Sequence, residues 1–352
     1  MRKIFLAFPG WEVQLKSKIS KINDFEFWNL NKIKKDEFID LIQKKIKPLN
    51  KNVRRDYYHF GDPEKFCISY KNSNWGMLLP DYNDGFDGNK RDSFLLIELF
   101  SGLPLSIMFT VGRGGIFIKK YNITELEKAS WRKEDIKFRN KKFINFYNKL
   151  YPIVTNTDWH ADKVLKWSRE EWRLCIAFLQ FEELFKYFRT KYPMRWQSEC
   201  SDIVSLYEIL LSRKKNDNGA YKIIQRIEIL LGSFYRKEMP TIKKELKKFY
   251  NFRNDFVHGS YFDHLKKETK SYPDDESMAQ MPSVDFRFLE RQFNIVRKVF
   301  VVYLFLIKKF KHKKIQKYKN KSISEIITDG IMDVKIRTLI QKYSEEILKL
   351  SI

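Results

Sequence analysis

The C-terminal half of the chain is organised by apolar residues that recur at helical spacing. The strongest example runs from Phe288 to Phe310, where long aliphatic and aromatic side chains dominate about six helical turns. Shorter segments with apolar positions three or four residues apart lie around 203–210, 221–234 and 240–257. A helix with an apolar stripe must bury that stripe against another element. The sequence therefore predicts a bundle of packed helices in this half.

Capping residues indicate where several of these helices begin or end. Ser168 and Glu171 form the S-x-x-E pattern of a capping box, which predicts a helix that starts here and continues to Phe188. Pro240 suits the first turn of a further helix, and Gly259 suits the residue just after its end. In the helix predicted to end at Phe188, the apolar residues at helical spacing include Trp172, Ile176 and Leu179.

The N-terminal half has a different pattern. Between Phe66 and Tyr121, short apolar stretches alternate with Gly, Pro, Asn and Asp, which is typical of strands and turns. Leu105–Val111 and Gly115–Lys120 are expected to pair as a hairpin through the glycines at 112–114. The other predicted strands are Phe66–Tyr70, Trp75–Leu79 and Ser93–Phe100. A helical segment at 134–150 is expected to lead into the second half.

These patterns predict an α+β fold of two domains. Residues 1–150 are expected to form a β-rich sensor or regulatory domain that ends in a bridging helix. Residues 151–352 are expected to form an all-α bundle with a basic C-terminal extension. A chain of 352 residues is long enough for two such cores.

The segment KKFYNFRNDFVHGS, at the end of the helix predicted from Pro240, carries the clearest chemical signal. It contains Arg253, Asn254 directly after it, and His258 five positions after the arginine. Histidine can take or give a proton near neutral pH, and a guanidinium matches the oxygens of a phosphate. Asn254 and His258 are four residues apart and share a helix face, so the amide can orient the imidazole. Arg253 and His258 lie about 140° apart around an ideal helix, so they converge only if the helix distorts at its end or if two copies of the motif face each other.

A plainer interpretation of the same residues also stands. Arg253 could be a surface residue paired with Asp255 or Glu245, and His258 a polar residue favoured by the helix dipole. A second arginine–histidine pair, Arg54 and His59, has the same spacing but lacks the polar residue and the closing glycine. We interpret that second pair as coincidence.

The segment around Arg253 resembles the R-x4-6-H signature of the HEPN superfamily of ribonucleases, in particular the Apea-like branch. The resemblance covers roughly residues 165–312 and includes the order of helices around the motif. It implies a HEPN-like bundle in which Arg253, Asn254 and His258 cut single-stranded RNA without a metal or cofactor. It also implies a homodimer, in which two motifs form one cleft and the cut leaves a 2′,3′-cyclic phosphate. Glu208, in the run SLYEILLS, would support Arg253.

By the same resemblance the protein would act in anti-phage defence or as a regulated toxin. The N-terminal domain would then respond to a phage-derived or nucleotide trigger. The alternative is a catalytically inactive HEPN-like module that binds a nucleic acid, a nucleotide or a protein.

Composition agrees with a polyanionic partner. The net charge is +24, and 16% of the residues are aromatic and could stack on unpaired bases. The densest basic run, 308–321, has eight lysines and no acidic residue. It fits a solvated helix end or linker, although it could also guide RNA to the cleft. The lysines considered for that role are Lys308, Lys309, Lys311, Lys313 and Lys314.

Several classes of protein are not expected. The cysteines Cys67, Cys175 and Cys200 form no C-x-x-C pair, which predicts neither a zinc site nor a disulfide framework. The first residues contain too short an apolar run for a signal peptide, and Phe300–Ile307 is too short to span a bilayer. We therefore expect a cytoplasmic protein without a membrane segment.

Overall fold

The computed structural model divides the chain into two compact units, Met1–Thr155 with Ile352, and Asn156–Ser351. The structure describes residues 2–9, 12–13, 19–22, 25–29, 32–34, 37, 73–82, 96, 98–100, 102, 107–112, 115–118, 137–138, 140–155, 168–190, 196–213, 219–257, 286–311, 318 and 320–351. Helix α5 (Asn140–Thr155) runs through the predicted domain boundary at residue 150 and ends where the first unit ends.

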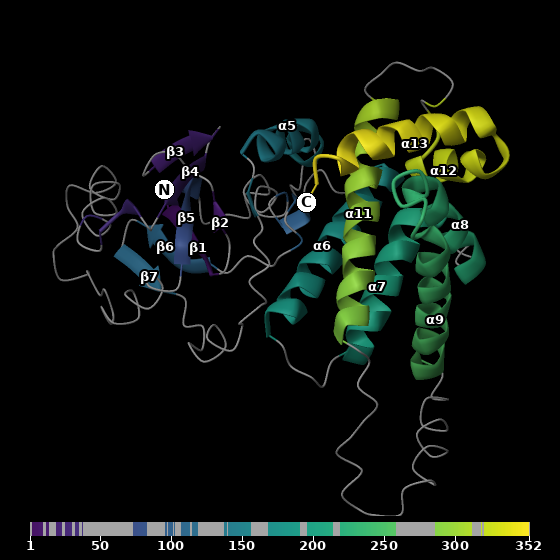
Figure 1. Cartoon of the computed structure of the whole chain (residues 1–352), viewed down its shortest axis with the longest axis horizontal. Helices are drawn as coiled ribbons and strands as arrows, with labels where there is room; N and C mark the ends of the chain where they lie inside the picture. The colour runs from purple at the N-terminus through teal and green to yellow at the C-terminus, as the bar shows by residue number, and fades with distance from the viewer. Residues whose placement is uncertain are drawn as a thin grey trace, which may run out of the picture. The chain divides into compact units, whose positions relative to one another are not determined.

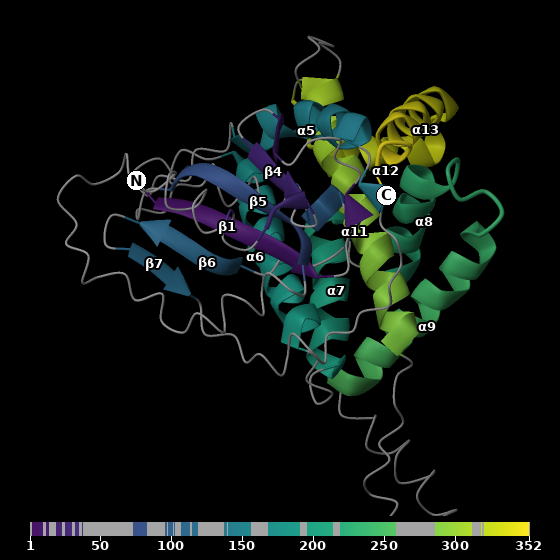
Figure 2. The same ribbon diagram turned by 60° about the vertical axis from the view of Figure 1, so that its left-hand side comes forward.

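The strands of the first unit form a six-stranded antiparallel sheet in the order β3-β4-β5-β1-β6-β7. Figure 2 shows β5, β1, β6 and β7 as neighbours. A separate parallel pair joins β2 to β8. The strands are β1 (Arg2–Pro9), β2 (Glu12–Val13), β3 (Ile19–Ile22), β4 (Phe25–Asn29), β5 (Ser73–Tyr82), β6 (Ile107–Gly112), β7 (Gly115–Ile118) and β8 (Lys137–Phe138).

Individual strand predictions had mixed outcomes. The hairpin is confirmed, because β6 and β7 pair antiparallel from Phe109 opposite Ile118 to Gly112 opposite Gly115. The strand expected at Trp75–Leu79 is confirmed within β5. The strand expected at Ser93–Phe100 is wrong, since the residues described there are helical. Phe66–Tyr70 lies outside the described residues.

The fold class predicted from the sequence, α+β with a β-rich N-terminal domain, is also wrong. Among the residues whose side chains the structure describes, 84% are helical, and those of the second unit form a helical bundle. In the first unit only the backbone of the strands is described, apart from Glu26 and Trp28. Most of the buried apolar side chains described there lie instead on helical segments, where Phe100 packs against Phe143 and Phe146 with ring centroids 5.2 and 5.3 Å apart. Short apolar stretches between turn residues do not distinguish a strand from a buried helix.

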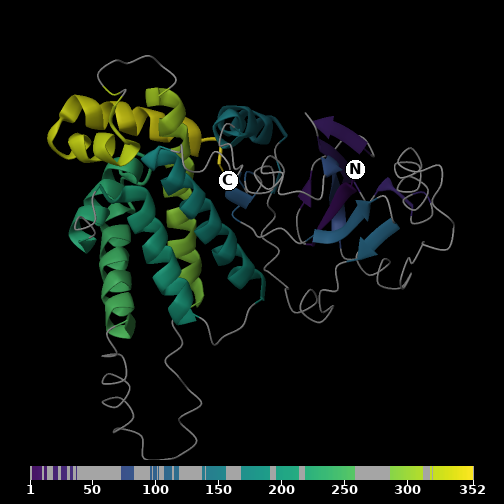
Figure 3. The same ribbon diagram turned by 180° about the vertical axis from the view of Figure 1, so that it is seen from behind.

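The second unit is a bundle of helices. Figure 1 shows α7, α9 and α11 side by side, and the view from behind in Figure 3 shows the same arrangement. The helices described are α6 (Arg169–Thr190), α7 (Trp196–Leu211), α8 (Ala220–Leu231), α9 (Met239–Val257), α11 (Phe286–Lys311), α12 (Ile323–Met332) and α13 (Val334–Leu348). The long apolar helix predicted at Phe288–Phe310 is confirmed as α11.

Helix α11 forms the core of the bundle. Every residue from Val299 to Leu306 is at most 1% exposed, which is expected of a helix surrounded by other elements. Phe300 packs on Phe178 of α6, and Phe310 packs edge-on against Tyr343 of α13. None of the helices that the structure describes is long and apolar enough to cross a membrane.

Helix α6 begins with the capping box that the sequence predicts, but the apolar residues noted in the sequence do not form its buried face. The capping box is present, because Ser168 N–H donates to Glu171 at 2.6 Å and Glu171 N–H donates to Ser168 Oγ at 3.3 Å. The residues that mark the helical turns in the sequence are nevertheless exposed, at 41% for Trp172 and 46% for Ile176 and Leu179. The buried face consists of Leu174, Ala177, Phe178, Phe181 and Leu184.

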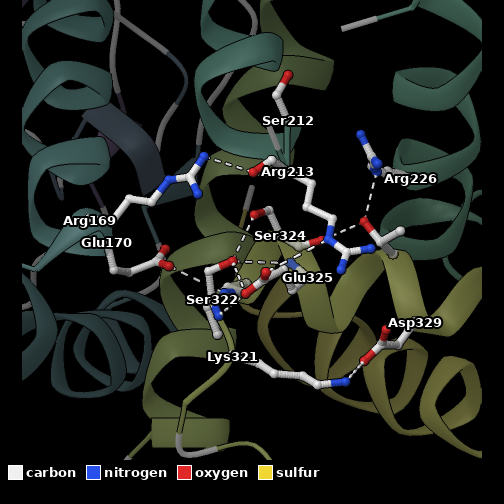
Figure 4. Close-up of polar contacts among 12 residues, drawn as sticks. Arg169, Glu170, Ser212, Arg213, Arg226, Lys321, Ser322, Ser324, Glu325 and Asp329 are labelled. Atoms are coloured by element: carbon white, nitrogen blue, oxygen red, sulfur yellow. Dashed lines mark hydrogen bonds and ion pairs between the residues drawn. The ribbon is translucent and has the colours of Figure 1, made fainter. Parts of the chain in front are cut away.

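Helices α12 and α13 are joined to the bundle by polar contacts around the start of α12 (Figure 4). Ser322 and Glu325 form a full capping box at this end. Glu325 also lies 3.7 Å from Arg213, whose backbone carbonyl accepts a hydrogen bond from Arg169 at 2.8 Å. One turn further along α12, Arg226 Nε donates to Thr328 Oγ1 at 3.0 Å. Side chains far apart in the sequence thus hold the start of α12.

Candidate functional site

Helix α9 carries two of the three predicted catalytic residues near its C-terminal end. Arg253 is half-buried and Asn254 is exposed, and the guanidinium Nη1 donates to the Asn254 amide oxygen at 3.2 Å. Helix α9 ends at Val257, so His258 is the next residue in the chain. His258 and Gly259 lie outside the described residues, as does His59 of the second arginine–histidine pair.

Glu208 of α7 lies within electrostatic range of Arg253. Burial raises the pKa of the Glu208 carboxyl, and the positive charge of Arg253 partly opposes that rise. The carboxylate makes no hydrogen bond or ion pair with any residue that the structure describes. Glu208 and Arg253 lie on α7 and α9, which pack against each other, while the supporting role of Glu208 stays a prediction.

One partner considered for Arg253 in the plainer interpretation is occupied elsewhere. Glu245 lies on α9 two turns before Arg253 and forms an ion pair with Arg291 of α11 at 3.2 Å. It also accepts a hydrogen bond from Gln292 Nε2 at 3.3 Å. A carboxylate held by two groups of α11 is a poor candidate for neutralising Arg253.

Two buried tyrosines that influence each other electrostatically, Tyr207 and Tyr250, were not identified from the sequence. Tyr207 of α7 is buried, and its hydroxyl donates to the backbone carbonyl of Gln292 at 3.4 Å. Tyr250 of α9 is 3% exposed, and its buried hydroxyl has no hydrogen-bond partner among the described residues. Burial and the Glu208 carboxylate raise the pKa of Tyr250, whereas Arg253 opposes the rise. The available sequence signal was the spacing of three, which places Tyr250 and Arg253 on one helix face.

The basic run is only partly described. Lys309 forms an ion pair with Glu346 of α13 at 2.8 Å, and its ammonium lies over the rings of Phe305 and Tyr343. An RNA-binding role for this lysine would have to break those contacts. Lys308 is half-buried on α11, and Lys311 is the last residue of that helix. Lys313 and Lys314 lie outside the described residues, so their role stays a prediction.

Comparison of the chain with models of protein families, with curated proteins and with solved structures found no match. Among the residues that the structure describes, no three His, Cys, Asp or Glu side chains are grouped so that they could hold a metal ion. Any function must therefore be argued from the residues themselves.

A second perturbed carboxyl on α7 leads to a test of stability against pH. Glu199 is 7% exposed, and burial together with the nearby Asp202 raises its pKa to about 7 from about 4.5. Between pH 4.5 and pH 7, folded Glu199 keeps a proton that the unfolded chain has lost. Stability contributed by this group is therefore present at low pH and lost as pH rises through 7.

Replacing Glu199 by glutamine should remove this pH dependence. We expect the wild-type free energy of unfolding to fall, relative to Glu199→Gln, by on the order of 3 kcal/mol between pH 4.5 and pH 7.5. Urea unfolding followed by helical circular dichroism at both pH values measures the difference. Glu345→Gln on α13, a solvated carboxylate paired with Lys349, is the control. Parallel curves for Glu199→Gln and the wild type would contradict the prediction.

Proposed function

We propose that the protein is a metal-independent endoribonuclease that cuts single-stranded RNA with Arg253, Asn254 and His258. One observation carries the proposal: the Arg253 guanidinium is held by Asn254 at the end of α9, directly before the only histidine in this segment. Glu208 lies close enough to influence the arginine electrostatically. A cation and groups that transfer protons near neutral pH are what phosphodiester cleavage needs when no metal takes part.

The chemistry assigns each residue a task. A histidine takes the proton of the ribose 2′-hydroxyl, the 2′-oxygen attacks phosphorus, and the bond to the 5′-oxygen breaks. A second acid gives a proton to that departing oxygen. Arg253 stabilises the extra negative charge of the pentacoordinate phosphorus, and the products are a 2′,3′-cyclic phosphate and a 5′-hydroxyl.

The spacing of the motif supports a site shared by two copies. On an ideal helix Arg253 and His258 would point about 140° apart. A single undistorted copy therefore does not bring the guanidinium and the imidazole into one cleft, and it supplies only one imidazole. In a homodimer one His258 acts as base and its twin as acid. We propose this homodimer as the active form, in the cytoplasm, with anti-phage defence or regulated toxicity as its biological setting.

Incubation of the full-length protein with RNA in EDTA tests the proposal. A labelled single-stranded RNA should be cut in EDTA, and the product should carry a cyclic phosphate by mass spectrometry. The same sequence with 2′-deoxyribose throughout should remain intact, because it lacks the attacking hydroxyl. Binding of RNA or nucleotide without any cleavage would favour an inactive binding module instead. Cleavage that EDTA abolishes would contradict the metal-independent mechanism.

A further inference from the structure

Three polar groups at Arg253 and near it lack hydrogen-bond partners, although they include both donors and an acceptor. The Tyr250 hydroxyl and Arg253 Nε are buried donors without a hydrogen-bond partner among the described residues. The Glu208 carboxylate is an acceptor that makes no hydrogen bond or ion pair within the same residues. Yet Glu208 influences Tyr250, and Arg253 influences both Tyr250 and Glu208. Two unused donors on α9 and one unused acceptor on α7 therefore belong to helices that pack against each other.

Leaving such groups unpaired in a folded protein is unfavourable. A buried donor without an acceptor costs about 1–3 kcal/mol, and most buried polar atoms in proteins are paired. The Glu208 side chain is half-buried and belongs to α7, whereas the two donors belong to α9. Because α7 packs against α9, a change of the Glu208 side-chain rotamer is the simplest movement that would offer these donors an acceptor.

We propose that Tyr250 is a positioning residue of the site, whose hydroxyl and Arg253 Nε together hold the Glu208 carboxylate when the guanidinium engages a phosphodiester. This inference rests on the proposed function for the identity of the bound group. The carboxylate then fixes Nε, Asn254 already accepts from Nη1, and the remaining donors of the guanidinium face the phosphate. A guanidinium held on two sides loses less side-chain freedom when it binds.

The two tyrosines of this region provide a matched comparison. Tyr250→Phe removes an unpaired hydroxyl and keeps the buried ring. Tyr207→Phe removes a hydroxyl of the neighbouring buried tyrosine, which donates to a backbone carbonyl instead. Both variants lose one oxygen from the same part of the bundle. Only Tyr250→Phe should disturb the site if the inference holds.

The first measurement needs no RNA substrate to be cut. The Glu208 carboxyl is titrated by NMR in ¹³C-glutamate-labelled full-length protein saturated with a 2′-deoxy oligonucleotide, and Glu208→Gln identifies its signal. A donated hydrogen bond favours the charged carboxylate, so Tyr250→Phe should raise the pKa of Glu208. Tyr207→Phe should leave that titration unchanged. An unchanged Glu208 titration in Tyr250→Phe would overturn the inference.

The second measurement is single-turnover cleavage of RNA. Tyr250→Phe should lower the maximal rate by about 10- to 100-fold and leave KM within about twofold, since misplacement of Arg253 is felt mainly in the transition state. Tyr207→Phe should cleave at the wild-type rate. Wild-type cleavage by Tyr250→Phe would overturn the inference. A shifted Glu208 titration in a protein that cuts no RNA would support the positioning role and reject the proposed function.

Discussion

Replacing Arg253 or His258 by alanine should each lower the rate of RNA cleavage by about 100- to 10,000-fold. Arg253→Ala removes the cation that stabilises the charged transition state, and His258→Ala removes the proton-transfer group. Arg253 lies near the end of α9 and is not among the buried core residues, and His258 is the residue directly after that helix. The variants should therefore keep wild-type circular dichroism and thermal unfolding while single-turnover cleavage falls.

The second arginine–histidine pair serves as the control for this experiment. His59→Ala should retain full activity, because that pair lacks the polar neighbour and the closing glycine. Activity that is lost with His59 and kept without His258 would overturn the assignment of the site. Equal activity in all three variants and the wild type would reject catalysis by Arg253 and His258.

The helices of the second unit were largely predictable because their signals are local. The apolar run of α11 and the capping box of α6 each depend on residues within one or two turns. Helices α12 and α13 were missed, although Ser322 and Glu325 form the same S-x-x-E pattern that located α6. That signal lies directly after a lysine-rich run, which suggested a linker instead.

What could not be predicted depends on packing between distant segments. The turns of α6 in the sequence were marked by Trp172, Ile176 and Leu179, yet these side chains are exposed. A broad apolar composition around a helix does not tell which stripe faces the core, because that choice depends on the neighbouring helices. The fold class was wrong for a similar reason, since short apolar stretches in the first unit fit either strands or buried helices.

In the candidate site, too, local signals could be predicted from the sequence and contacts between distant segments could not. Arg253, Asn254 and His258 follow from spacing along one segment, and the approach of Glu208 was expected only from a family resemblance. Tyr250 required the structure, because its unpaired hydroxyl and its electrostatic coupling to Glu208 arise between α7 and α9.

The largest effect on stability is expected from Arg173, the centre of a buried polar network. This side chain is 9% exposed and donates to the Tyr303 hydroxyl at 3.3 Å, to Ser324 Oγ, and to the backbone carbonyl of Ser212 at 2.8 Å. Glu170, 5% exposed, accepts from the Tyr303 hydroxyl and from the backbone N–H of Ile323 at 3.3 Å. The network joins α6, the end of α7, α11 and the start of α12.

Arg173→Met should lower the free energy of unfolding by about 3–5 kcal/mol, because it leaves the buried Glu170 carboxylate without its compensating cation. It also leaves the Ser212 carbonyl without the Arg173 donor, whereas Ser324 Oγ keeps its contact with Ser322 Oγ. Replacing Glu170 and Arg173 together by leucine and methionine should recover part of that loss, since no charge then remains buried. Urea unfolding of the full-length protein measures all three.

Arg169→Met provides the matched control on the same helix. Arg169 is exposed and donates to the Arg213 carbonyl at 2.8 Å, so its replacement should change the free energy of unfolding by less than about 1 kcal/mol. The contrast separates the buried cation from a general effect of removing arginine from a basic protein. A loss of under 1 kcal/mol in Arg173→Met would show that the network does not hold α12 on the bundle. A double variant no more stable than Arg173→Met would show that the buried Glu170 charge is not the cause.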